Sequence, residues 1–118
     1  MKGVFEMKKI TALLLVVMFL AIVIAEPASA ASSTYSSTGR GFSQAWEATA
    51  SGTSWLIKYG YNTAWINEDY THTYHSSKSH VAIVSNANGS FTDYDIGGYW
   101  AGIEVTHSGS YVTYTISY

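Results

Sequence analysis

The side chains best suited to chemistry are concentrated in residues 70–84. This stretch holds His72, His75 and His80 together with Lys78, and its second half is a short apolar run rich in β-branched residues. Such a run between polar turn formers is typical of a buried strand. A polar and aromatic segment that leads directly into a core strand predicts a functional surface held on a rigid element.

The histidines are candidate metal ligands, but their spacing argues against a shared site. A metal ion needs side chains that converge on one point. On a strand, His72 and His75 point to opposite faces because they are three positions apart, and a turn lies between His75 and His80. We therefore expect the four histidines, including His107, to be hydrogen-bonded locally, and we expect neither a metal nor another cofactor.

Catalytic groups are hard to find in this sequence. Serines are abundant, yet the nucleophile-elbow motif of hydrolases is missing. Asp93 and Asp95 share one face of a predicted strand and could form a carboxylate pair, although solvated surface charge explains them as well. We expect no catalytic residue, and a hydrolase that depends on Asp93 is the least favoured alternative.

The first thirty residues have the pattern of a secretory signal peptide. Lys8 and Lys9 precede an apolar segment over residues 10–25, and a small-x-small cleavage pattern follows at Ala28 and Ala30. The apolar segment is shorter than the ~20 residues of a membrane-spanning helix. We therefore expect a secreted, extracellular protein whose signal peptide is residues 1–30.

Charge and cysteine content narrow the function further. Residues 31–118 carry three strong bases against six carboxylates and contain no cysteine. Binding to nucleic acid or to anionic lipid by charge alone needs clustered Lys and Arg, so neither is expected. Without disulfides, the fold must depend on its core, and all four Trp and all ten Tyr lie in this part of the chain.

Hydrophobic alternation predicts an all-β domain over residues 52–118, a small antiparallel β-sandwich of two short sheets. Residues 53–61 alternate with Trp55, Ile57 and Tyr59 on one face, and residues 99–105 and 110–118 alternate in the same way. The last two segments are expected to form a hairpin, and an Asn-Gly pair at 88–89 predicts a second hairpin with a type I′ turn. Residues 31–51 are rich in Ser, Thr, Ala and Gly, and we expect them to be a poorly ordered extension. Within it, residues 44–50 could form one amphipathic turn or a short strand, and the sequence does not decide between the two.

Two exposed aromatic residues leave an alternative open. Trp100 lies on the opposite face from Ile103 and Val105, and Tyr111 lies opposite Val112. If a second sheet covers that face, both are core residues. If it does not, they form an aromatic patch suited to a partner, a sugar or a lipid headgroup.

Several short motifs, taken in order, resemble the lactococcin 972 family of secreted bacteriocins over residues 52–118. The start of this region is similar to the Gly-Thr-Trp opening of that family. The remaining similarities are spread along the domain. The matching residues are Gly52-Thr53-Ser54-Trp55, Tyr59-Gly60-Tyr61, Tyr70, His75, Ser77-Lys78, His80, Ala82, Val84, Trp100-Ala101 and Ser110-Tyr111.

The resemblance implies a sandwich of two antiparallel sheets that binds the cell-wall precursor lipid II without catalysis and inhibits growth or septum formation of related Gram-positive bacteria. Dedicated membrane immunity and transport proteins of the producer would be partners. Backbone N–H groups of residues 76–79 would receive phosphate oxygens, and Lys78 would add charge. The predicted ligand-binding residues are Tyr70, His72, His75, Ser77, Lys78, His80, Trp55 and Trp100.

An alternative is a cell-surface β-domain that binds glycan or matrix without killing. It would use exposed Trp and Tyr side chains as its binding surface. Residues 114–118, as an edge strand, could also pair with a second copy to give a homodimer.

Overall fold

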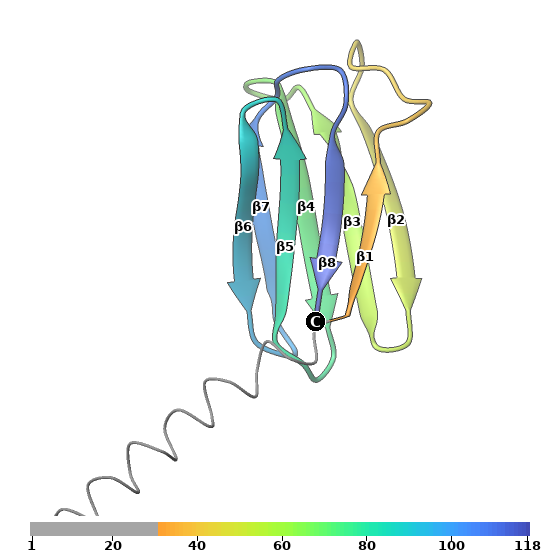
Figure 1. Cartoon of the computed structure of the whole chain (residues 1–118), viewed down its shortest axis with the longest axis vertical. Helices are drawn as coiled ribbons and strands as arrows, with labels where there is room; N and C mark the ends of the chain where they lie inside the picture. Colours follow the sequence, from red (N-terminus) through yellow and green to blue (C-terminus); the bar gives the residue numbers. More distant parts are fainter. Residues whose placement is uncertain (1–30) are drawn as a thin grey trace, which may run out of the picture. The chain divides into compact units, whose positions relative to one another are not determined.

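Two antiparallel four-stranded sheets face each other in the computed structural model, which describes residues 31–118 (Figure 1). The predicted signal peptide, with Ala28 and Ala30, lies outside the described residues. Within residues 31–118 there is no helix long and apolar enough to cross a membrane. The strands are β1 (Ser32–Ser36), β2 (Trp46–Gly52), β3 (Trp55–Asn62), β4 (Glu68–His75), β5 (His80–Asn86), β6 (Gly89–Asp95), β7 (Trp100–Thr106) and β8 (Thr113–Ser117).

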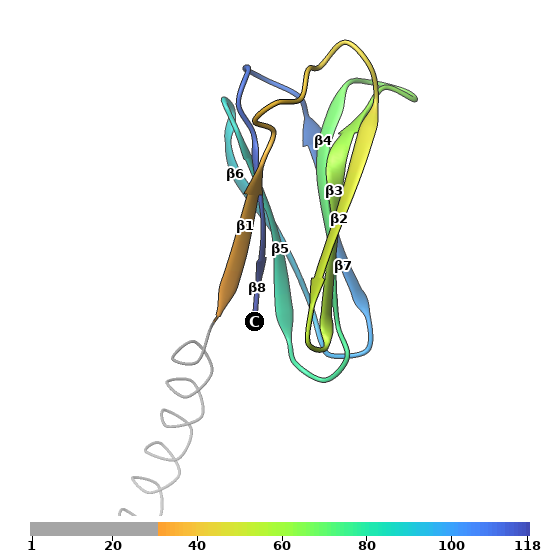
Figure 2. The same cartoon turned by 90° about the vertical axis from the view of Figure 1, so that its right-hand side faces the viewer.

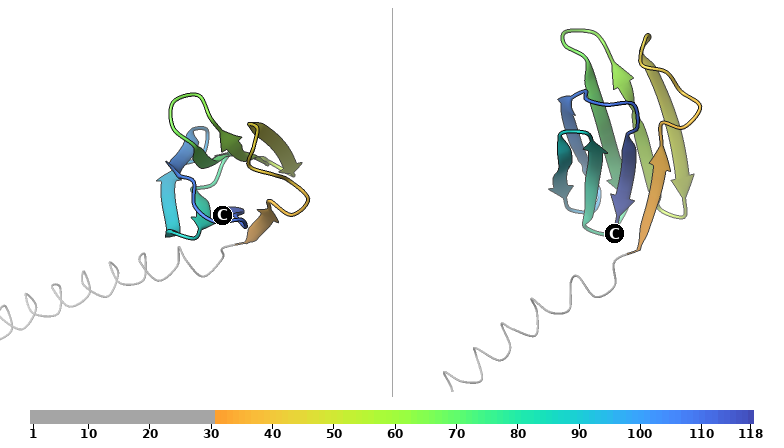
Figure 3. Two further views of the ribbon diagram at one scale, coloured as in Figure 1. Left: turned by 90° about the horizontal axis from the view of Figure 1, so that it is seen from above. Right: turned by 45° about the horizontal axis from the view of Figure 1, so that its top comes forward.

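The strand order is β1-β8-β5-β6 in one sheet and β2-β3-β4-β7 in the other. Hairpins within a sheet join β2 to β3, β3 to β4, and β5 to β6, and the other four connections cross between the sheets. The two layers are seen edge-on in Figure 2 and from above in Figure 3. The predicted all-β sandwich is confirmed.

The core follows from the alternation of side chains along each strand. Ala82 and Val84 of β5 and Tyr114 and Ile116 of β8 point inward and are fully buried, and Ile57 of β3 meets them from the other sheet. Each buried aliphatic side chain contributes ~1.5–3 kcal/mol through the hydrophobic effect. Aromatic rings fill the layer around this centre and replace the disulfides that a secreted domain of this size often needs.

The expectation of a poorly ordered extension over residues 31–51 is wrong. Residues of β1 pair with β8, and all seven residues of β2 pair with β3. Two aromatic rings hold these strands to the core, since Tyr35 stacks on Tyr59 at 5.2 Å between ring centroids and Trp46 meets Tyr114 edge-on at 5.8 Å. The domain therefore begins at residue 31 and not at residue 52. The sequence does not show this because the residues of the segment are small and polar, which makes its alternation hard to see.

The predicted hairpin between residues 99–105 and 110–118 is also wrong. β7 pairs with β4, whereas β8 lies between β1 and β5 in the opposite sheet. The connection contains Gly109 at a φ of 87°, a conformation that serves a crossover between sheets as well as a tight hairpin. Because both sides of β8 are already paired, residues 114–118 cannot form the edge contact expected of a homodimer.

The second predicted hairpin, β5–β6, is confirmed, but its turn differs. Asn86 pairs with Gly89, so Ala87 and Asn88 are the central turn residues. Neither has a positive φ, and only Gly89 does, at 130°. The Asn88 N–H instead donates to the Asn86 side-chain oxygen at 2.8 Å, which closes the turn without a type I′ geometry.

Candidate functional site

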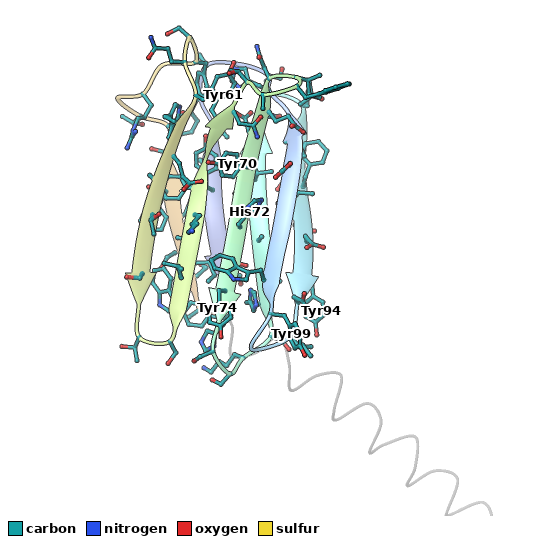
Figure 4. The ribbon with its side chains drawn as sticks, turned by 180° about the vertical axis from the view of Figure 1, so that it is seen from behind. Tyr61, Tyr70, His72, Tyr74, Tyr94 and Tyr99 are labelled. Carbon is teal, nitrogen blue, oxygen red and sulfur yellow. The ribbon has the colours of Figure 1, made fainter. Side chains whose placement is uncertain are left out.

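The outer surface of the sheet β2-β3-β4-β7 carries the largest group of polar and aromatic side chains that the core does not use. Tyr70, His72 and Tyr74 alternate along β4 and point away from the other sheet, in a line that Figure 4 shows. The strand register then sets their neighbours on β2, β3 and β7. We call this surface the β4 face and define it by Glu47, Lys58, Tyr70, His72, Tyr74, Trp100 and Glu104.

Two glycines lie opposite rings of β4 in the strand pairing. Gly60 is the pairing partner of Tyr70, and Gly102 is the pairing partner of His72. A Cβ placed on Gly102 would lie 3.0 Å from the His72 ring, so a larger residue there would push the imidazole outward. Tyr70 is only 7% exposed although it points outward.

Carboxylates fix the orientation of two of these rings. The Tyr70 hydroxyl donates to Glu47 Oε2 at 2.7 Å, and His72 Nε2 lies 3.1 Å from Glu104 Oε1. Burial raises the pKa of Tyr70 far above its ordinary value, and the bond to Glu47 and the charges of Glu47 and Glu104 raise it further. The phenol therefore remains a hydrogen-bond donor at physiological pH, held in one position.

The β4 face contains an aromatic pair with a cation beside it. The Tyr74 and Trp100 rings lie 5.5 Å apart, and the Lys58 Nζ lies 5.7 Å from the centre of the Trp100 ring. Trp100 is 46% exposed. An exposed aromatic surface can stack on the C–H face of a sugar ring, while the neighbouring amine and carboxylates bond to hydroxyl or phosphate groups.

Further exposed apolar side chains lie near the end of β6, at Tyr94, and in the β6–β7 connection, at Ile96 and Tyr99, and each is more than half exposed. Figure 4 shows Tyr94 and Tyr99 at the same end of the sandwich as Tyr74. The connection is rigid, because the Gly98 N–H donates to the His75 carbonyl at 2.8 Å. A rigid aromatic surface loses little conformational entropy on binding.

Of the eight predicted site residues, the structure brings Tyr70, His72 and Trp100 together on the β4 face. His75, His80 and Trp55 lie inside the sandwich, where Trp55 packs against Tyr118 at 6.0 Å between ring centroids. Ser77 and Lys78 lie in the turn between β4 and β5. Each histidine is hydrogen-bonded within the fold, but only His75 bonds to near neighbours in the chain, so the expectation of local bonds holds for His75 alone. His72 and His75 point to opposite sides of the sheet, as their spacing predicts.

His75 holds the β4–β5 turn together. Its Nδ1 accepts the backbone N–H groups of Ser77 at 3.1 Å and Lys78 at 2.9 Å. Burial lowers the pKa of His75, and the charges of Lys78 and His80 lower it further, so the imidazole is neutral at pH 7. The Ser76 N–H donates to the Ser54 carbonyl at 2.8 Å. The N–H groups of Ser76, Ser77 and Lys78 are therefore bonded within the fold and are not free for the phosphate that this turn was predicted to bind.

His80 ties the two sheets together. Its Nε2–H donates to the Tyr99 carbonyl at 2.8 Å, so its Nδ1 accepts the Thr73 hydroxyl at 2.7 Å. Both partners lie in or beside the sheet opposite β5. With 1% of its surface exposed, His80 supports the fold and is not available to a ligand from solvent.

A buried Asp–His pair at the other end of the sandwich resembles half of a catalytic triad. His107 Nδ1 lies 2.9 Å from both carboxylate oxygens of Asp69, and Asn86 donates to Asp69 Oδ2 at 2.9 Å. The His107 ring is packed on Phe42 at 4.2 Å between ring centroids. Among residues 31–118, no serine or threonine hydroxyl is hydrogen-bonded to His107, so the pair has no nucleophile to activate.

The two aspartates considered as a carboxylate pair each bond to the backbone. Asp93 Oδ2 accepts the Gly102 N–H at 2.9 Å, which links edge strand β6 to edge strand β7 across the sandwich. Asp95 Oδ1 accepts the N–H of Ile96 at 2.8 Å. Both contacts have a structural role and leave no convergent acid–base pair.

Sequence reasoning missed the two carboxylates of the β4 face. Glu104 lies beside His72 only because β7 pairs with β4, a pairing that local sequence does not encode. Glu47 was missed because its strand was predicted to be disordered. The only available signal was the alternation of Glu47 and Thr49 with Trp46, Ala48 and Ala50.

Within residues 31–118, no group of three or more His, Asp or Glu side chains could hold a metal ion. No protein-family model matches the sequence, no curated protein matches it, and no solved structure matches the fold. The resemblance to the lactococcin 972 family therefore remains a hypothesis, and the β4 face is the site from which function is argued.

Proposed function

We propose that this protein is a secreted, non-catalytic binding protein of the bacteriocin type, which captures a cell-wall precursor resembling lipid II and inhibits growth or septum formation of related Gram-positive bacteria. The proposal places the ligand on the β4 face. The observation that carries it is the Tyr74–Trp100 ring pair, in which Trp100 is exposed, with Lys58 beside it. Membrane proteins of the producer would provide immunity and transport.

The chemistry of the β4 face fits a lipid-linked sugar precursor. Such a precursor joins an amino-sugar disaccharide to a pyrophosphate. The Tyr74 and Trp100 rings would stack on a sugar, and Lys58, whose Nζ lies 5.7 Å from the centre of the Trp100 ring, would donate to a phosphate oxygen. Glu104, which is held beside His72, would accept bonds from sugar hydroxyls.

An inhibition assay with two variants tests the proposal. Protein secreted by cells that express the full chain is added to growing Gram-positive cells, with and without purified lipid II. We expect inhibition that added lipid II relieves. Trp100→Ala should weaken lipid II binding at least about tenfold, the scale of losing a central tryptophan in an interface. Thr92→Ala, on the outer surface of β6, is the matched control and should inhibit like the wild type.

The outcome against the proposal is specific. Equal binding of lipid II by the Trp100→Ala and Thr92→Ala proteins would remove the ligand from the β4 face. Protein that is folded by circular dichroism but neither inhibits growth nor binds lipid II would refute the bacteriocin activity itself.

A second candidate function is glycan binding at a cell surface without killing. The charges of the β4 face favour glycan binding, because the face carries the carboxylates Glu47 and Glu104 as well as Lys58 and His72. A surface with mixed charge suits a neutral polysaccharide better than a pyrophosphate. Binding to insoluble polysaccharide that is lost in Trp100→Ala, together with no growth inhibition, would favour this function.

A further inference from the structure

The connection between β3 and β4, residues 63–67, presents two apolar side chains to solvent far from the Tyr74–Trp100 pair. Trp65 is 91% exposed and Ile66 is 45% exposed. Figure 2 shows this connection extending away from both sheets, at the end of the sandwich opposite the C-terminus. Exposing a tryptophan almost completely is costly in water and marks a contact surface.

The base of this connection is fixed to the fold. The His107 N–H donates to the Asn67 carbonyl at 2.8 Å, directly before β4 begins. On the other side, Asn62 at the end of β3 pairs with Glu68 at the start of β4. Trp65 and Ile66 are therefore held out as a short protrusion on a fixed base.

The rest of this end of the sandwich is nearly free of charge. Four connections lie here, residues 37–45, 63–67, 87–88 and 107–112, and among them Arg40 is the only Lys, Arg, Asp or Glu. A second amphipathic ring, Tyr111, is 59% exposed in the last of these connections. A surface with few charges and exposed Trp and Tyr side chains has the composition found at membrane–water interfaces.

We propose that the connection at residues 63–67 inserts Trp65 and Ile66 into the interfacial region of a phospholipid bilayer. A bilayer accepts a single protruding side chain without a matching pocket, which a protein partner would have to provide. Arg40, the one charged residue of these four connections, is cationic and complements the lipid phosphates, while the carboxylate of Glu68 lies at the start of β4, behind the protrusion. Insertion would hold the protein at the membrane that carries a lipid-linked precursor, but the contact does not depend on the proposed function.

Vesicles of phosphatidylcholine and phosphatidylglycerol test this proposal, because they contain no cell-wall precursor. Secreted protein from cells that express the full chain is sedimented with the vesicles, and its tryptophan emission is measured with brominated lipids, which quench a ring inserted into the bilayer. We expect co-sedimentation and quenching for the wild type. The double variant Trp65→Ala/Ile66→Ala should lose both, with a partition coefficient at least about tenfold lower, the scale of burying one large apolar side chain.

A matched control separates insertion from a general loss of folding. Thr63→Ala changes an exposed residue of the same connection and should bind vesicles like the wild type. Circular dichroism should show the same β spectrum for all three proteins. Wild-type protein that stays in solution, or a double variant that sediments as well as Thr63→Ala, would overturn the proposal and would leave binding at the β4 face untouched.

Discussion

Two buried tyrosines should respond in opposite ways to the loss of one hydroxyl. The Tyr114 side chain is fully buried, and no protein group is hydrogen-bonded to its hydroxyl. Burial raises its pKa far above the ordinary value, and the charges of Asp69, Tyr70 and Tyr59 raise it further. A buried hydroxyl without a partner costs ~1–3 kcal/mol. We expect Tyr114→Phe to increase the free energy of unfolding by about 1 kcal/mol.

Tyr70→Phe is the matched comparison, since it removes the same atom from another buried ring. The Tyr70 hydroxyl donates to Glu47 at 2.7 Å, and Glu47 is exposed. A hydrogen bond to a charged group contributes ~1.5–3 kcal/mol, and solvent near Glu47 reduces this. We expect Tyr70→Phe to decrease the free energy of unfolding by about 1 kcal/mol.

Thermal unfolding followed by circular dichroism measures both effects. For a domain of this size, 1 kcal/mol shifts Tm by about 4–8 °C, so the two variants should differ by roughly 10 °C. Urea unfolding with unchanged m-values would show that the folded and unfolded states keep their compactness. If Tyr114→Phe lowers the stability as much as Tyr70→Phe does, the Tyr114 hydroxyl has a partner and the reasoning is wrong.

Two further variants test the turns beside the β4 face. The folded state lowers the pKa of His75, so the unfolded state binds more protons as the pH falls below ~6.5, and the free energy of unfolding decreases. His75→Asn does not titrate, and its Tm should therefore decrease less between pH 7 and 5 than that of the wild type. Equal decreases in Tm for the two proteins would contradict this. A Cβ on Gly97 would lie 2.3 Å from the Ser77 carbonyl carbon, so Gly97→Ala should lower the free energy of unfolding by ~1–3 kcal/mol. Gly41 has open space around it, and the control Gly41→Ala should change the free energy of unfolding by less than ~0.5 kcal/mol. Urea unfolding measures both values.

Strand positions and their buried faces were predictable where apolar residues alternate. In β3 the inward residues Ile57 and Tyr61 are buried and Lys58 is exposed, as the period of two requires. The same holds for Tyr114 and Ile116 in β8. Alternation is a local property of the backbone, so the sequence alone shows which side of a strand faces the core.

Strand partners were not predictable, because pairing depends on contacts between distant residues. β8 alternates in the way that a strand of a hairpin with β7 would, and nothing in residues 107–112 shows that the chain crosses to the other sheet there. β1 and β2 escaped prediction for a related reason. Their stability comes from β8 and β3, to which they pair, and their own Ser- and Ala-rich sequences show little propensity for strands.

The same distinction explains which half of the candidate site could be found in advance. Tyr70, His72 and Tyr74 share a face because each is two positions from the next, and this spacing can be seen in the sequence alone. Trp100 joins them only through the register between β4 and β7, and Lys58 only through the register between β3 and β4. His75 and His80 illustrate the converse error. A polar residue next to an exposed turn suggests ligand binding, but here both side chains satisfy backbone groups where chain segments cross between the sheets, and that task requires burial.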